Sequence, residues 1–233
     1  MEENQPHQNK INKLMLILFG IFAVLTVIFT VIVKNVDVRP IGPEDSSIGL
    51  ASINSPVHEA LPYNELWYKL TKYSGYLIYV PPVFFVLLFF VQLFRRRSLK
   101  KVDREMKLFV VYLLAVLAIY FAFDHLVIIN YRPVLIASEL EPSYPSSHTL
   151  FAVSLCGASM LLVSNFLKLK HKTFMNIFLI LLAVFNIVGR VISGVHWATD
   201  IFAGLLFGFT LLFAFAAFLR RKVCYNEVKL NKE

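Results

Sequence analysis

The sequence predicts an all-α membrane protein, a single bundle of six transmembrane helices. Of the 233 residues, 58% are hydrophobic and only 16% are charged, and 22 are phenylalanine. A soluble domain of this size could not cover so much apolar surface. We therefore expect one domain over residues 1–233. Its helices should be the six apolar stretches that approach or reach the length needed to cross a bilayer: Leu14–Val33, Tyr76–Phe94, Leu108–Ile129, Leu150–Leu167, Phe174–Val191 and Ile201–Leu219.

The first two helices and the segment between them carry further signals. The first stretch is too long and too uniformly apolar for a cleaved signal peptide, so we expect an uncleaved anchor. Pro81-Pro82 should kink the second helix or end a half-helix there. Residues 34–75 begin as a loop and continue with leucines and aromatic residues among polar ones. They predict short interfacial helices after the first span, with Trp67 at headgroup depth.

The distribution of positive charge predicts the orientation. The formal net charge is +8, and most lysines and arginines lie before the first helix, in 95–107, in 168–172 and after the last helix. These segments should face the cytoplasm together with both termini. This bias explains the basic charge without a nucleic-acid partner. The size and the lack of a targeting signal favour a bacterial plasma membrane, with a eukaryotic endomembrane as the alternative.

Ionisable residues gather on the opposite, non-cytoplasmic side. His196 and Asp200 are four residues apart, so a helix that starts between them would let the carboxylate hold one imidazole nitrogen. Arginines have a planar cation that suits a phosphate. Such groups next to membrane helices favour a functional role, although a helix junction in which they only pair with one another is the alternative. The whole set is Arg132, Ser146, His148, Arg190, His196 and Asp200.

These side chains could transfer a phosphoryl group through a phosphohistidine. His196 would attack phosphorus and Asp200 would stabilise the imidazolium, while His148 would protonate the leaving oxygen and then activate water. Arg132 and Arg190 would bear the growing negative charge. No cofactor is required. Two histidines and an aspartate could bind zinc, but the arginines would repel a metal cation, and the histidines are not closely spaced.

Pro145, Ser146 and Ser147 directly before an apolar run predict a helix start with a serine as N-cap. The free N–H groups of that helix would face the outer side and attract an anion. Ser146 and Ser147 are therefore candidate phosphate ligands, although helix capping alone would account for both.

Together these blocks resemble the type 2 phosphatidic acid phosphatase superfamily of membrane lipid phosphate phosphatases. Its signature is K-x6-R-P, then P-S-G-H, then S-R-x5-H-x3-D. The corresponding blocks here, within residues 108–219, are Arg132-Pro133, Pro145-Ser146-Ser147-His148 and Gly189-Arg190-x5-His196-x3-Asp200. The resemblance implies that His196 is the nucleophile, Asp200 its partner and His148 the acid. It also implies that phosphate is bound by Arg132, Arg190 and Ser146.

Three positions depart from the signature. The lysine is replaced by His125, the glycine by Ser147 and the first serine of the third block by Gly189. A protonated His125, favoured by Asp124 beside it, could replace the lysine in phosphate binding.

We therefore predict an integral-membrane phosphatase acting on an amphiphilic lipid in the bilayer, such as a polyprenyl pyrophosphate, phosphatidate or phosphatidylglycerol phosphate. Two alternatives remain open. One is a lipid phosphotransferase that uses the same site, and the other is a catalytically weak relative that binds lipid phosphates. The sequence predicts no oligomeric state.

Overall fold

The computed structural model describes residues 5–136, 138–166 and 169–219. Within them, β structure is limited to isolated bridges. The helices are α1 (Gln5–Asn35), α2 (Ala51–Ala60), α3 (Glu65–Ile78), α4 (Val80–Arg96), α5 (Arg104–Phe121), α6 (Ser147–Phe151), α7 (Gly157–Phe166), α8 (Leu169–Ile192) and α9 (Ala198–Phe218), with the 3-10 turns η1 (Pro43–Asp45) and η2 (Leu99–Lys101) and the π-helical turns η3 (Ala122–Leu126) and η4 (Ala152–Cys156).

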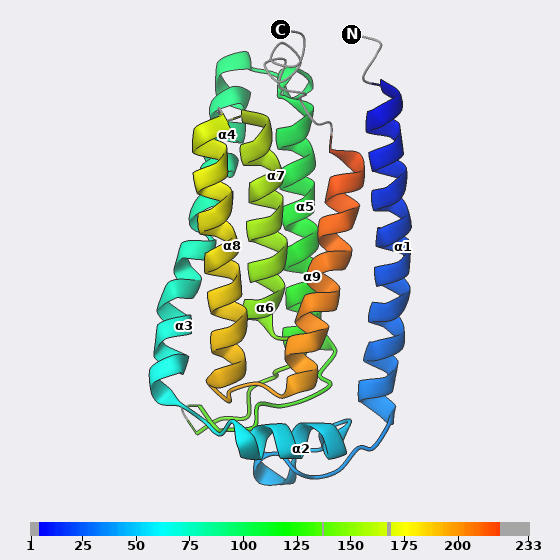
Figure 1. The fold of residues 1–233 in the computed structure, drawn as a ribbon, viewed down its shortest axis with the longest axis vertical. Helices are drawn as coiled ribbons and strands as arrows, with labels where there is room; N and C mark the ends of the chain where they lie inside the picture. Colours follow the sequence, from blue (N-terminus) through cyan, green and yellow to red (C-terminus); the bar gives the residue numbers. More distant parts are fainter. Residues whose placement is uncertain (1–4, 137, 167–168, 220–233) are drawn as a thin grey trace, which may run out of the picture.

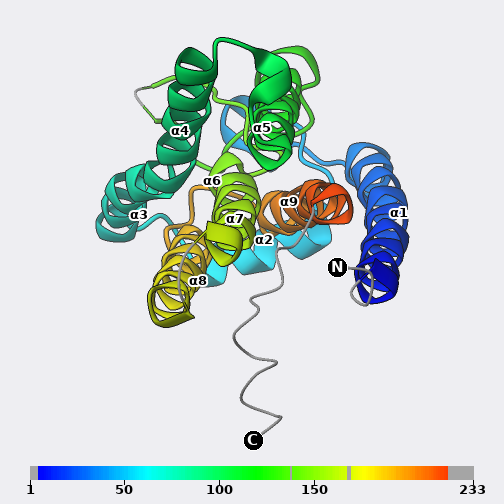
Figure 2. The same cartoon turned by 90° about the horizontal axis from the view of Figure 1, so that it is seen from above.

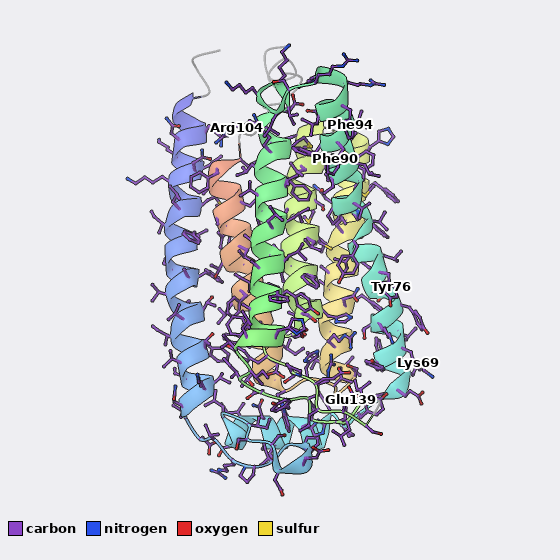
Figure 3. The ribbon with its side chains drawn as sticks, turned by 180° about the vertical axis from the view of Figure 1, so that it is seen from behind. Lys69, Tyr76, Phe90, Phe94, Arg104 and Glu139 are labelled. Atoms are coloured by element: carbon purple, nitrogen blue, oxygen red, sulfur yellow. The ribbon has the colours of Figure 1, made fainter. Side chains whose placement is uncertain are left out.

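The prediction of an all-α membrane protein with six spans is confirmed. Six helical segments are long and apolar enough to cross a membrane: Gln8–Asn35, Glu65–Arg96, Arg104–Leu126, Ser147–Asn165, His171–Ile192 and Ala198–Phe218. They run along the long axis of the molecule, and α2 lies across one end (Figure 1). Large apolar side chains cover the outside of the bundle, among them Phe90 and Phe94, 44% and 72% exposed, which project from α4 (Figure 3). A surface of this kind is stable against lipid.

The span that begins at Ser147 is the centre of the bundle. In its apolar window, 67% of the residues are buried, against 11% for the first span. Viewed along the bundle, α7 lies between α5, α8 and α9, and α1 stands at the edge beside α9 (Figure 2). Gly204 of α9 allows this packing, because a Cβ atom there would lie 2.8 Å from Cβ of Thr149 in α6. The close approach brings the start of α6 next to the start of α9.

The second span differs from the prediction. Residues 65–72 were predicted to belong to short interfacial helices, and they instead form the first half of α3, which continues into α4 as one long helical segment, Glu65–Arg96. The buried residues Thr71, Gly75 and Ile78 form one side of α3, and α3 packs along α8. The ring of Trp67 lies 5.8 Å from that of Phe185. Close helix packing therefore outweighs the mixed polarity of this stretch.

The kink expected at Pro81-Pro82 is present. Helix α3 ends at Ile78 and α4 begins at Val80, with Tyr79 between them. The prolines stand in the first turn of α4, where their missing N–H groups cost no helical hydrogen bond.

Candidate active site

The polar residues singled out in the sequence lie at the end of the bundle where α6 and α9 begin and α8 ends. This is the end crossed by α2, opposite the end where α1 begins (Figure 1). The backbone N–H of Ser146 donates to the carbonyl oxygen of Asp200 over 2.9 Å. The indole N–H of Trp197 donates to the carbonyl oxygen of Tyr131 over 2.7 Å. These bonds join three segments that are far apart in the sequence.

Asp200 is fixed by the first turn of α9. Trp197 is the N-cap residue, and its backbone N–H donates to Oδ2 of Asp200 over 3.1 Å. The side-chain N–H of Asn130 donates to Oδ1 over 2.9 Å. The same Oδ2 lies 3.8 Å from Nδ1 of His196, and the Asp200 side chain has no exposed surface. The carboxylate is therefore held by two donors and faces the imidazole, as the four-residue spacing predicted.

His196 is buried next to Asp200. The residue is 6% exposed, and neither ring nitrogen has a hydrogen-bond partner within the described part of the chain. Burial lowers the pKa of His196 well below its usual value, and the guanidinium groups of Arg132 and Arg190 lower it further. The imidazole is therefore neutral at neutral pH, the protonation state that a nucleophilic histidine needs.

A cavity of about 250 Å³ opens beside this histidine and is lined by Arg132, Ser147 and Glu141 among others. The side chain of Arg132 is 15% exposed, and its Nε lies 2.8 Å from the carboxylate of Glu141. Its Nη1 is buried without a hydrogen-bond partner among the described residues. A buried guanidinium with an unused donor is costly unless an anion satisfies it.

His148 stands in the first turn of α6, where its Nε2 contacts the guanidinium of Arg190. Arg190 is only 1% exposed and its guanidinium carbon lies 5.4 Å from the centre of the Tyr68 ring. Two more nitrogens of Arg190 are buried with no partner in the resolved segments, and so is Nδ1 of His148. His148 also lies within electrostatic range of His196 and Arg132. Of these four residues, Arg132 and His196 line the cavity, whereas His148 and Arg190 contact each other and do not line it.

Three of the candidate phosphate ligands, Arg190, His125 and Ser146, do not line the cavity. His125 is 54% exposed in the π-helical turn η3, its Nε2 is 3.3 Å from Asp124, and it does not line the cavity. Ser146 occupies the N-cap position of α6 but is fully buried, and its hydroxyl accepts a hydrogen bond from Thr149 over 3.2 Å. Of the two serines, Ser147 is the one that faces the cavity.

The departure at Gly189 has a structural reason. A Cβ atom at this position would lie 2.3 Å from the methyl carbon of Thr71 in α3. A serine would push α3 away from α8, so the glycine allows the helix packing that brings Tyr68 over Arg190.

The sequence did not point to Asn130, Glu141 or Tyr68 as parts of the site. Their types and spacing match no motif, and only the fold shows what they contact. The one available signal was the closeness of Asn130 to Arg132 in the chain. No group of three His, Cys, Asp or Glu side chains with metal-site geometry occurs in the described ranges.

Fold and site together define a six-span membrane protein with a buried His-Asp pair and two arginines at one end of the bundle. Residues 122–224 match the sequence model of the PAP2 superfamily. The structure is similar to the crystal structure of a transmembrane PAP2-type phosphatidylglycerolphosphate phosphatase from Bacillus subtilis. The TM-score is 0.56 and the sequence identity 17%, over 94% of this chain and 97% of that one. No curated protein sequence matches the chain. The family match over residues 122–224 and the structural similarity together support membership of the PAP2 superfamily and a membrane phosphatase in general.

Proposed function

We propose that the protein is an integral-membrane lipid phosphatase that hydrolyses a phosphate monoester or diphosphate through a phosphohistidine. The observation that carries this proposal is the buried His196, with a free Nε2 on one side and the carboxylate of Asp200 3.8 Å from Nδ1 on the other. A neutral imidazole backed by a carboxylate is a nucleophile that becomes a stabilised cation when it attacks.

The reaction has two steps. In the first, Nε2 of His196 forms a bond to phosphorus, the bond from phosphorus to the leaving oxygen breaks, and His148 gives that oxygen a proton. In the second, His148 takes a proton from water, the water oxygen attacks phosphorus, and the N–P bond breaks to release inorganic phosphate. Asp200 stabilises the imidazolium between the steps.

The unused donors of Arg132 and Arg190 support this chemistry. A phosphoryl group in transfer spreads negative charge over its equatorial oxygens, and fixed cations there lower the barrier. The guanidinium fork suits two phosphate oxygens at once. Ser147 lines the same cavity and adds a hydroxyl donor.

The surroundings of the site favour a lipid substrate. An apolar groove of about 310 Å³ between α4 and α5 is lined by Tyr79, Phe151 and Leu155, among other residues. Tyr79 also interacts electrostatically with Arg190 and with Tyr120, a residue of the polar cavity. A lipid tail in the groove would therefore place its headgroup beside the two histidines.

The location follows from charge. Arg104 lies at the end of the bundle where α1 begins, and Glu139 lies at the end that carries the site (Figure 3). Since basic loops remain in the cytoplasm, we place both termini there and the site on the non-cytoplasmic side of a bacterial plasma membrane.

The test is phosphate release by purified protein in detergent, with a chelator present, from a panel of lipid phosphates and diphosphates. His196→Ala and His148→Ala should each abolish release from every lipid that the wild type hydrolyses. His171→Ala is the matched control, because His171 is exposed near the start of α8, far along the helix from the site. Continued turnover in His196→Ala would refute the nucleophile. Phosphate release that requires an added lipid alcohol would identify a transferase instead.

A further inference from the structure

Two cations approach the same aromatic ring beside the site. The guanidinium carbon of Arg190 lies 5.4 Å from the centre of the Tyr68 ring, and Nζ of Lys72 lies 5.9 Å from it. Both distances are within the range of cation–π attraction. Tyr68 and Lys72 are one turn apart on α3. Tyr68 is half-buried, whereas Lys72 is exposed. The Tyr68 ring thus lies next to one buried cation, Arg190, and one exposed cation, Lys72.

These two cations lie close to His148. Gly75, less than a turn beyond Lys72 on α3, packs against that imidazole: a Cβ atom there would lie 3.2 Å from Cδ2 of His148. Lys72 is also close enough to His148 to act on its charge. Since His148 gives its proton to the leaving oxygen, the leaving group must emerge on this side, toward α3.

Lys72 has no carboxylate partner in the described ranges, whereas its neighbour Lys69 pairs with Glu65 over 2.6 Å. An exposed, unpaired ammonium contributes little to folding. It can therefore turn toward an anion at small cost. The phosphate cavity itself lacks the third cation of the family signature, because the substituting His125 lies outside it.

We propose, on the basis of the function above, that Lys72, Tyr68 and Arg190 form a leaving-group subsite that binds the second phosphate of a lipid diphosphate. His196 would attack the terminal phosphorus, and the bond to the bridging oxygen would break. The bridging oxygen would leave with its electron pair and a proton from His148, as part of a lipid monophosphate. That leaving group remains anionic, and the two cations neutralise it. The leaving group of phosphatidate is an uncharged alcohol, which gains nothing from the subsite.

The test compares kcat/KM for farnesyl diphosphate and for a short-chain phosphatidate in the same detergent. The wild type should prefer the diphosphate. Lys72→Met should lower kcat/KM for the diphosphate by about tenfold, the loss of one charge-assisted contact, and leave phosphatidate hydrolysis within about twofold. Lys69→Met, the matched control on the same helix, should change neither. Lys72→Arg should restore most of the diphosphate activity.

Inhibition gives an independent measurement. Inorganic pyrophosphate should compete better than inorganic phosphate with the wild type, and Lys72→Met should remove that difference. Equal losses on both substrates, or no loss on the diphosphate, would overturn the subsite while the phosphatase function stands. A wild type that hydrolyses neither lipid would overturn the proposed function, and the subsite with it.

Discussion

Replacement of Asn130 should damage the site without touching a reacting group. Asn130 is fully buried. Its side-chain N–H donates to Oδ1 of Asp200 over 2.9 Å, and its Oδ1 accepts from the backbone N–H of Gly49 over 3.3 Å. Asn130→Ala removes both bonds and leaves the carboxylate with the backbone N–H of Trp197 as its remaining hydrogen-bond donor among the residues described.

The magnitude follows from these two bonds. A hydrogen bond to a charged group contributes about 1.5–3 kcal/mol and a neutral one about 0.5–1.5 kcal/mol. We therefore expect Asn130→Ala to lower the free energy of unfolding by about 2–4 kcal/mol. Since a carboxylate free to turn no longer orients His196, kcat should fall by roughly ten- to a hundredfold. Asn130→Asp should be more harmful at neutral pH, because it places a second carboxylate against Asp200.

The assay is phosphate release together with thermal unfolding in detergent, followed by tryptophan fluorescence. Asn35→Ala is the matched control, because the Asn35 side chain is exposed at the end of α1 and, within the described residues, bonds only to the carbonyl oxygen of Val31 one turn back. A variant of Asn130 with the activity and unfolding temperature of the wild type would refute the assigned role. A loss of stability with unchanged kcat would reduce Asn130 to a purely structural residue.

Three further predictions follow from the site. His125→Lys should leave activity and its pH dependence unchanged, because His125 is 54% exposed and outside the cavity; a rise in kcat would contradict this placement. Glu141→Gln should lower KM several-fold, because the substrate then no longer competes with a carboxylate for the guanidinium of Arg132. Steady-state kinetics measure this change, and an increase in KM would contradict the prediction. The pKa of His196 is held well below 6.5 by burial and by the nearby arginines, so the nucleophile stays neutral as pH falls. Protonation of His196 should therefore lower kcat/KM only below about pH 6.5. If kcat/KM already falls as the pH drops below a value above 7, and this fall depends on His196, the nucleophile is not held neutral.

The sequence was sufficient to predict the six spans and to place the candidate reacting groups at one end of the bundle. Hydropathy alone locates the apolar stretches, since a bilayer demands their length. The four-residue spacing of His196 and Asp200 determines the relative position of their side chains, because α9 begins between them. Arg132 and Arg190 could be placed on one side because charge bias orients the helices.

Two features depended on packing that a sequence pattern does not contain. The mixed polarity of α3 suggested an interfacial helix, but small residues such as Gly75 and Gly189 allow it to pack along α8. The six-residue spacing suggested that His125 faces phosphate. The widened turn η3 instead turns its ring toward Phe121, 4.7 Å away between ring centroids. Neither packing distance nor a π turn leaves a periodic signal in the chain.

The pairing of α1 with α9 has a consequence for biosynthesis. α1 leaves the ribosome well before α9, yet the hydroxyl of Thr26 lies 3.0 Å from that of Thr210, and α1 packs along α9 (Figure 2). The side chain of Asn54 bonds both the hydroxyl and the backbone N–H of Thr199, one residue before Asp200. The nascent chain therefore cannot bring His196 and Asp200 together in this environment until α9 has entered the membrane. Unfinished chains that stall in the translocon should be inert toward the lipids around them.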